Sequence, residues 1–290
     1  MKQLIRYMKN KKVGSTPIIE YQNLYYKLEF YNPTGSIKDR AAYKILENYF
    51  EKGLIKENTT IVLATSGNMG ISFAYFGMKF KIKVVIVMPE GLSIERYNLL
   101  KRYKAEIILT KCELGMEGAI MKALELAQTK GYFLIDQFDN PYNKLANIET
   151  GKEIIKDIPN VDYIICGIGT GGTISGICEY MKQNKIKVDI VGVEPYESPK
   201  ITKNKKGKHL IQGIGAGIIP SLINLNDIYE VETVKSKMVI EKFKNNNPLL
   251  LGLSSIACEI VAKRIKTKNP KAKIVIVVAD GMDRYGSMIK

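Results

Sequence analysis

Histidine, cysteine and tryptophan are scarce in this sequence. Its 290 residues include one histidine, four cysteines and no tryptophan. His209 alone cannot build a zinc or iron site that needs several histidines, and a Ser-His-Asp triad would have to run through it. The cysteines form no C-x-x-C pair and are too few for a disulfide framework. We therefore expect no bound metal, and we expect Lys, Tyr, Asp, Glu or a cofactor to carry any acid–base chemistry.

Long hydrophobic runs are also lacking. No apolar stretch reaches the ~18–20 residues that a membrane-spanning helix needs. The first residues, MKQLIRYMKNKK, are basic but have neither the apolar segment nor the small-residue cleavage site of a signal peptide. We therefore expect a cytoplasmic protein without a membrane partner, with about two domains on a prior of ~150 residues each.

Basic residues outnumber acidic ones. The sequence has 44 Lys and Arg against 29 Asp and Glu, a formal net charge of +15. Such a charge can indicate nucleic-acid binding, but the lysines are scattered and the one dense run, residues 203–209, is a single loop-like stretch. No zinc knuckle and no aromatic-rich RNA-binding strand occurs. We interpret the charge as a lysine-rich composition that attracts small anions, and we predict no nucleic-acid partner.

Short β-branched runs alternate with helical patterns along the chain. Six runs are apolar throughout, which is typical of strands buried on both faces of a parallel sheet. They are residues 61–64, 84–88, 107–110, 163–166, 190–193 and 274–278. The helical patterns cover residues 41–52, 71–80, 95–104 and 116–130.

This alternation predicts an α/β fold. Because the runs cluster in two sets, we expect two lobes, each built on a mostly parallel twisted sheet with flanking helices. Residues 39–143 are expected to form a smaller N-terminal lobe, and residues 1–38 and 144–290 a larger one.

A glycine-rich loop, Gly167-Ile-Gly-Thr-Gly-Gly-Thr173, follows the predicted strand 163–166 and opens a helical segment. Glycines let backbone N–H groups approach an anion, and a helix N-terminus adds partial positive charge. The loop lacks the Lys-Ser/Thr pair of a Walker loop, and its spacing does not fit G-x-G-x-x-G. It therefore predicts a phosphate site, with a tight structural turn as the alternative.

A second polar turn, Thr65-Ser-Gly-Asn-Met-Gly70, follows the predicted strand 61–64. Its hydroxyl, amide and backbone N–H groups suit a carboxylate or a ring oxygen. Helix capping by Ser66 or Asn68 would explain the same residues. Ligands of open parallel sheets bind outside the carboxyl ends of the strands, so both turns are candidate sites.

Lys38 lies in the segment 32–40, directly before a predicted helix. Most single lysines are solvated charges. At a helix start, however, the macrodipole disfavours a cation and lowers the pKa of the amine. Small neighbours would let the amine be enclosed, and a lysine with a lowered pKa is what Schiff-base chemistry needs.

These three segments, in this order, resemble the fold-type II pyridoxal-phosphate enzymes of the cysteine synthase and cystathionine β-synthase family. The similarity extends over nearly the whole chain. Its further motifs are Gly14-Ser-Thr-Pro17, Met88-Pro-Glu-Gly-Leu-Ser-Ile-Glu-Arg96, Gln137-Phe-Asp-Asn140, Glu194-Pro195, Ile211-Gln-Gly-Ile-Gly-Ala-Gly217, Gly252-Leu-Ser-Ser255 and Asp283-Arg-Tyr285. The resemblance implies a fold like that of the tryptophan synthase β-subunit, with pyridoxal 5′-phosphate as cofactor.

The resemblance also implies roles for the matching residues. Lys38 would bind the cofactor as a Schiff base and act as the acid–base group at the substrate α-carbon. The implied cofactor-binding residues are Lys38, Asn68, Gly169, Thr170, Gly171, Gly172, Thr173 and Ser254, with Asn68 at the ring 3′ oxygen and Ser254 at the pyridine nitrogen. The implied substrate-binding residues are Thr65, Ser66, Asn68, Met69 and Gln137.

Three positions depart from the usual family pattern. Met69 stands where the carboxylate loop usually has threonine, which replaces a hydroxyl with a polarizable apolar group. Ile256 stands where glycine is usual, and the motif 279–285 lacks the Pro-Ser start of many O-acetylserine enzymes. These departures leave the cofactor chemistry unchanged and the substrate open.

Asp227 is a candidate second catalytic residue. The stretch 224–229 matches a loop that approaches the mouth of the active site in the family. There, Asp227 could orient water toward an aminoacrylate, so that cysteine would give serine and sulfide. A solvated loop carboxylate is the alternative.

The implied reaction is β-replacement on a small amino acid through an aminoacrylate. O-acetylserine or a related donor plus sulfide would give L-cysteine. The alternatives are an L-cysteine β-lyase or hydratase that gives L-serine and hydrogen sulfide, a cystathionine β-synthase-like enzyme, and a serine or threonine dehydratase. The resemblance also implies a homodimer, with serine acetyltransferase as a candidate partner.

Overall fold

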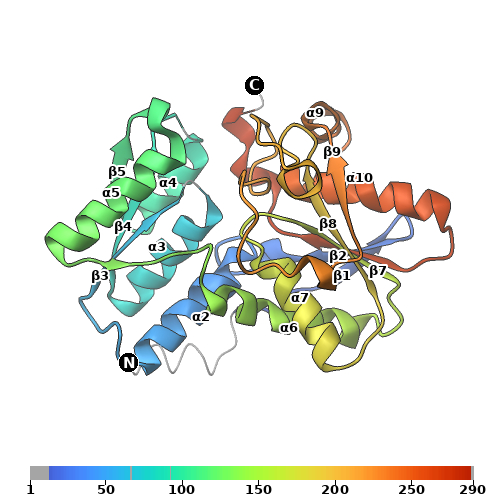
Figure 1. Ribbon diagram of the computed structural model, residues 1–290, viewed down its shortest axis with the longest axis horizontal. Helices are drawn as coiled ribbons and strands as arrows, with labels where there is room; N and C mark the ends of the chain where they lie inside the picture. Colours follow the sequence, from blue (N-terminus) through green and yellow to red (C-terminus); the bar gives the residue numbers. More distant parts are fainter. Residues whose placement is uncertain (1–12, 66, 92, 289–290) are drawn as a thin grey trace.

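Two β-sheets lie side by side in the protein (Figure 1). The computed structural model describes residues 13–65, 67–91 and 93–288 of the chain. The six-stranded sheet has the order β1 (Ile18–Tyr21), β2 (Leu24–Leu28), β10 (Ile274–Val278), β7 (Tyr163–Gly167), β8 (Asp189–Pro195) and β9 (Glu230–Val234). The four-stranded sheet has the order β5 (Glu106–Thr110), β4 (Lys83–Pro89), β3 (Thr60–Ala64) and β6 (Phe133–Leu134).

Parallel pairing dominates both sheets. The described pairs of the smaller sheet are all parallel, and in the larger sheet β1 pairs antiparallel with β2 while the other pairs are parallel. All five residues of β10 are buried, because helices cover both faces of the larger sheet. The predicted α/β class is confirmed, and all six apolar runs form strands. The expected burial is wrong for β5, which lies at the edge of the smaller sheet and has no buried residue.

The helices that surround the sheets are α2 (Lys38–Glu51), α3 (Asn68–Phe80), α4 (Ile94–Arg102), α5 (Gly115–Lys130), α6 (Pro141–Asp157), α7 (Gly172–Gln183), α8 (Lys200–Lys203), α9 (Ser236–Asn245) and α10 (Leu253–Lys268). Short 3-10 turns are η1 (Glu29–Tyr31), η2 (Cys112–Leu114), η3 (Leu225–Asp227), η4 (Met282–Arg284) and η5 (Gly286–Met288). In Figure 1, α2 and α6 run along the lower edge between the two sheets, and they contact each other. None of the helices in the described part of the chain combines the length and apolar character that a membrane crossing requires.

The four strands β1, β2, β6 and β9 were not indicated by the apolar runs. The helix expected to begin at residue 41 begins at Lys38. We propose the lobe boundaries 39–143 and 1–38 plus 144–290, with the support that every strand of the smaller sheet lies between residues 60 and 134.

Candidate active site

Segments that are far apart in the sequence meet at the carboxyl end of β10. The backbone N–H of Ile37 donates to the carbonyl of Ala279 at 2.9 Å, and Ser36 forms an isolated antiparallel bridge with Asp280. The N–H of Gly252 donates to the carbonyl of Asp280 at 3.0 Å. The start of α2 and the start of α10 are therefore fixed to the same short stretch of chain.

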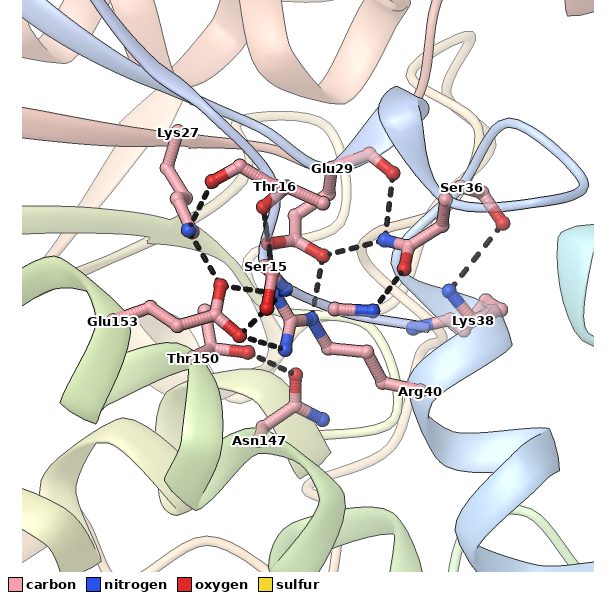
Figure 2. Close-up of polar contacts among 12 residues, drawn as sticks. Ser15, Thr16, Lys27, Glu29, Ser36, Lys38, Arg40, Asn147, Thr150 and Glu153 are labelled. Atoms are coloured by element: carbon pink, nitrogen blue, oxygen red, sulfur yellow. Dashed lines mark hydrogen bonds and ion pairs between the residues drawn. The ribbon is translucent and has the colours of Figure 1, made fainter. Parts of the chain in front are cut away.

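Lys38 is the first residue of α2 and is half-buried. Its backbone N–H donates to Ser36 Oγ at 3.3 Å, as Figure 2 shows. Desolvation by burial lowers the pKa of the Lys38 amine, and the nearby Asp280 carboxylate partly opposes this change. The amine is therefore closer to its neutral, nucleophilic form at neutral pH than a solvated lysine would be.

A buried ion network holds the first turn of α2 (Figure 2). Arg40 Nε contacts Glu29 Oε2 at 2.7 Å, and Arg40 Nη2 contacts Glu153 Oε2 of α6 at 2.7 Å. Lys27 of β2 contacts Glu153 Oε2 at 2.6 Å and donates to the carbonyl of Thr16 at 2.6 Å. The network fixes α2 to both the larger sheet and α6, so the backbone that carries Lys38 is positioned by charge-assisted hydrogen bonds.

The glycine-rich loop joins the carboxyl end of β7 to the start of α7. Gly171 has φ +83°, a left-handed conformation that favours glycine. A Cβ at Gly169 would collide with the carbonyl of Gly213, and a Cβ at Gly172 would collide with the side chain of Asn143. These three positions need glycine because neighbouring groups leave no space for a side chain, and the loop is consistent with the predicted anion cradle.

Asn143 of α6 connects the glycine-rich loop with Gln137. Its Nδ2 donates to Thr170 Oγ1 at 2.9 Å and to the carbonyl of Gln137 at 2.9 Å. Gln137 Nε2 in turn lies 3.4 Å from the carbonyl of Ala64, the last residue of β3. The structure therefore brings Gln137 to the end of β3, where Thr65 follows, as the prediction of a shared carboxylate site requires.

The turn after β3 lies beside this contact. Thr65 is buried, its N–H donates to the carbonyl of Val87 at 3.0 Å, and its Oγ1 accepts from the N–H of Gly67 at 3.4 Å. Asn68 begins α3 and donates through Nδ2 to Asp280 Oδ2 at 2.6 Å. Ser66 lies outside the described residues.

Ser254, in the first turn of α10, is buried next to the glycine-rich loop. A Cβ added to Gly167 would lie 3.8 Å from Ser254 Cβ, and a Cβ added to Gly213 would lie 3.9 Å from Ser254 Oγ. Thr173 lies in the first turn of α7, at the same end of the larger sheet. The predicted cofactor-binding residues at 169–173 and 254 are therefore neighbours in the structure.

The structure places Asp227 away from the glycine-rich loop. Asp227 lies in η3, before the amino end of β9, where its Oδ1 is 3.4 Å from Lys182 Nζ and its Oδ2 accepts from Asn224 at 3.0 Å. Lys182 follows Gly172, the first residue of α7, by ten residues, or about 15 Å at 1.5 Å rise per residue. Asp227 therefore lies at the amino end of β9, at the opposite end of the larger sheet from the glycine-rich loop, and this placement does not support the predicted catalytic role.

Met69 also differs from the expectation. Its side chain is 1% exposed and belongs to the hydrophobic core between α2, α3 and the smaller sheet. The polarizable side chain packs in this core because it fills an irregular apolar space. We therefore leave Met69 out of the substrate-binding set.

Asp280 is the site residue that sequence reasoning missed. It is fully buried, it accepts from Asn68 Nδ2 and from the Tyr285 hydroxyl at 2.6 Å each, and its charge faces Lys38. The signal available in the sequence was a carboxylate directly after a buried strand, in the motif that departs from the usual Pro-Ser start.

The arrangement joins three chemical capabilities. The glycine-rich loop offers backbone donors to a phosphate, the turn after β3 offers donors to a carboxylate, and Lys38 offers an amine with a lowered pKa. A site of this kind suits a phosphorylated carbonyl compound together with an amino acid.

Comparisons with known proteins agree with this chemistry. A model of the family described as pyridoxal-phosphate dependent enzyme matches residues 10–280. Cysteine synthase B of Campylobacter jejuni is 42% identical over 282 residues, which cover 94% of each protein. The cysteine synthase of Buchnera aphidicola is 40% identical over 295 residues, which cover 94% of this chain and 92% of that protein.

Solved structures share the fold. Cysteine synthase from Entamoeba histolytica superimposes with a TM-score of 0.89 at 33% identity, covering 96% of this chain and 88% of that one. A hydrogen sulfide-producing enzyme from Fusobacterium nucleatum gives a TM-score of 0.90 at 36% identity, covering 95% of this chain and 98% of that one. The chain belongs to the pyridoxal-phosphate dependent enzyme family.

Proposed function

We propose that this protein is a pyridoxal-phosphate enzyme that catalyses β-replacement on a small amino acid, with O-acetylserine or a related donor and sulfide giving L-cysteine. The observation that carries the proposal is the enclosed Lys38 amine, with its lowered pKa, in a site that also contains the glycine-rich loop. Relatives at 42% and 40% identity that are named cysteine synthases support this choice of reaction.

The described residues fit the cofactor. The glycine-rich loop is a cradle that Cβ atoms at Gly169 and Gly172 would fill. Asn68 Oδ1 is buried and accepts no hydrogen bond from the described residues, so it has capacity for a polar group of a ligand. Lys38, Asn68, Ser254 and the loop residues 169–173 would hold the cofactor, whose pyridine ring, when bound, stabilises negative charge at the substrate α-carbon.

The chain's own groups supply binding and proton transfer. Thr65, Ser66, Asn68 and Gln137 would bind the substrate carboxylate, which orients the α-carbon toward Lys38. The neutral Lys38 amine would take the α-proton, and the resulting ammonium would return a proton later in the cycle. The Ser254 hydroxyl at the ring nitrogen would leave that nitrogen unprotonated, which suits loss of a β-substituent more than deeper carbanion chemistry.

The second candidate is the breakdown of L-cysteine to L-serine and hydrogen sulfide. The likeness to the hydrogen sulfide-producing enzyme of Fusobacterium nucleatum supports it. The residue that we expected to orient water, Asp227, is bound to Lys182 and Asn224 instead. This placement supports β-replacement as the first candidate.

Absorbance spectra test the cofactor proposal. We expect the purified protein to show the visible band of lysine-bound pyridoxal phosphate and expect the Lys38→Ala variant to lose it. The matched control is Lys52→Ala at the exposed end of the same helix, which should keep the band. A wild-type protein without the band after incubation with pyridoxal phosphate would contradict the proposal.

A substrate panel tests the reaction. The three assays are O-acetylserine plus sulfide, O-phosphoserine plus sulfide, and cysteine alone. Cysteine formation in either of the first two supports β-replacement. Release of sulfide and serine from cysteine, without cysteine synthesis, would overturn it in favour of the second candidate.

We also propose a homodimer and a cytoplasmic location. Light scattering would show the homodimer as twice the mass of one chain. We propose serine acetyltransferase as a partner, which co-purification of the two pure proteins would test. The four cysteines are free thiols and three of them are buried, which supports a reducing cytoplasm.

A further inference from the structure

Asp280 occupies a position where both sheets meet the candidate site. Its backbone follows β10 of the larger sheet and bridges Ser36 and Gly252 on either side. Its carboxyl group reaches Asn68, the first residue of α3, which is 212 residues away in the sequence. One side chain therefore links the carboxyl end of β10 in the larger sheet with the turn that follows β3 of the smaller sheet.

The carboxyl group is enclosed but incompletely bonded. Oδ2 accepts from Asn68 Nδ2 and from the Tyr285 hydroxyl, each at 2.6 Å. Oδ1 is buried and accepts no hydrogen bond from the described residues. A Cβ at position 252 would collide with Oδ1, so glycine at this position is what gives the carboxyl group its space.

Charged and titratable groups from several elements face this carboxyl group. They are Lys38 of α2, Arg96 of α4, and Arg284 and Tyr285 at the C-terminal motif. Burial raises the pKa of Asp280, while the hydrogen bonds from Tyr285 and Asn68 and the two arginines oppose this change. Asp280 in turn opposes the lowering of the Lys38 pKa by burial.

We propose that Asp280 is a positioning residue of the cofactor site, which orients the Asn68 amide and places a buried carboxyl group beside the start of α2, where Lys38 lies. The inference rests on the proposed function, in which Lys38 and Asn68 hold the cofactor. It adds a residue that acts on both of these groups without being one of the implied cofactor contacts.

The orientation of Asn68 follows from hydrogen-bond chemistry. A carboxylate only accepts, so the amide nitrogen of Asn68 must face it. The Oδ1 of Asn68 then faces away from the Asp280 carboxyl group and has no partner among the described residues. A neutral amide at position 280 could donate instead, and it would allow the Asn68 amide to turn over.

The effect on Lys38 follows from Coulomb's law. A carboxylate near an enclosed amine stabilises the ammonium form, so Asp280 raises the pH at which Lys38 loses its proton. Lys38 remains a stronger base than burial alone would allow, which matters for a group that takes the α-proton.

The first experiment uses the apoprotein, so that it does not depend on catalysis. Acetylation of Lys38 by acetic anhydride is measured by mass spectrometry across pH for the wild type and for Asp280→Asn. We expect the midpoint of the pH profile to fall by about one unit in the variant, because an adjacent opposite charge is removed. The matched control, Glu51→Gln, changes an exposed carboxylate at the other end of α2 and should leave the midpoint unchanged.

The second experiment uses the cofactor-loaded protein. The visible band is titrated with pH in the wild type and in Asp280→Asn, and we expect the titration midpoint of the band to shift in the variant. If Asp280→Asn does not fold, Tyr285→Phe removes one donor from the same carboxyl group. It should shift the apoprotein midpoint in the same direction as Asp280→Asn but by less.

Identical Lys38 midpoints in the wild type and in a folded Asp280 or Tyr285 variant would overturn the inference. A wild type that never binds pyridoxal phosphate would overturn the proposed function, whereas the apoprotein profile of Lys38 would still decide the role of Asp280.

Discussion

At the scale of single residues, burial acts differently on two carboxyl groups near the start of α2. Asp39 accepts from the N–H and the hydroxyl of Thr34, at 2.6 Å each, and burial raises its pKa to about 6. Burial also opposes ionisation of Glu153, but hydrogen bonds and charges from Arg40 and Lys27 lower its pKa to about 2. At Asp39, neutral donors and the charge of Arg284 do not compensate for desolvation, whereas at Glu153 two hydrogen-bonded cations do.

Replacing Asp39 should change how stability depends on pH. Because the pKa of Asp39 is raised from 3.8 to about 6 in the folded protein, its contribution to stability is present below pH 3.8 and is lost as the pH rises through about 6. The change corresponds to about 3 kcal/mol across this window. We expect the unfolding free energy of Asp39→Asn, measured with urea on the apoprotein, to show no such decrease between pH 4 and 7. Parallel stability curves for the wild type and the variant would contradict the assignment.

At the scale of elements, the ion network connects α2 to α6. Both Arg40 and Lys27 are buried. Glu153 forms ion pairs with both of these cations, whereas Glu29 forms an ion pair with Arg40. Removing a partner from a buried ion pair leaves an uncompensated charge. The network is therefore expected to matter for stability even though an intact buried pair contributes little by itself.

Glu153→Gln tests this connection. We expect the variant to lose about 3–5 kcal/mol of unfolding free energy at pH 7. Because the pKa of Glu153 is lowered from 4.5 to about 2, the wild type should keep its contribution above pH 4.5 and lose it as the pH falls through about 2. The difference between the two proteins in denaturant unfolding should therefore shrink in acid.

Glu149→Gln, on the same helix, is the matched control. Its ion pair with Lys152 spans 3.4 Å between side chains that are more than half exposed. Exposed pairs contribute about 0–1 kcal/mol, so the control should remain close to the wild type. Equal losses in the two variants would mean that the buried network has no special role.

The glycine-rich loop can be tested in the same way. A Cβ at Gly169 would collide with the carbonyl of Gly213, so Gly169→Ala must displace the loop that we propose holds the phosphate. We expect an affinity for pyridoxal phosphate at least about tenfold weaker, equal to ~1.4 kcal/mol, measured by fluorescence titration. Gly131→Ala, where a Cβ would meet nothing within 4 Å, is strained only by its φ of +63° and should bind normally. Unchanged binding in a folded Gly169→Ala would show that the loop does not hold the phosphate.

At the scale of the whole molecule, short apolar runs predicted six of the strands, and the structure adds the four strands β1, β2, β6 and β9. The run 274–278 was visible because every residue is buried, whereas β9 carries Glu230 and Glu232 at a sheet edge, and β2 carries the buried charge of Lys27. The strand β6 has two residues, too few to form a pattern. An apolar run therefore predicts a strand but not its burial, since β5 was predicted from its run and has no buried residue. A strand that carries charged residues gives no such run.

The residues of the candidate site also differ in whether the sequence alone can predict them. Lys38 and residues 167–173 were found because a motif is local in sequence. Asp280 was missed because its partner Asn68 is 212 residues away, and only the fold brings them together. The position of Asp227 could not be predicted either, because the sequence does not show that η3 precedes the amino end of β9.

Cofactor binding should stabilise the molecule as a whole, because the proposed contacts come from both sheets. A ligand that binds only the folded state at about 100 times its Kd adds ~2.7 kcal/mol. For a chain of this size we expect pyridoxal phosphate to raise the Tm of the apoprotein by about 5 °C or more in differential scanning fluorimetry. Lys38→Ala should show a smaller rise at the same concentration, because the amine that would hold the cofactor is absent. Inorganic phosphate, which can occupy only the glycine-rich loop, should produce a smaller rise than the whole cofactor. An equal rise with phosphate alone would mean that the loop binds an anion while Lys38, Asn68 and Ser254 contribute nothing to holding the ring.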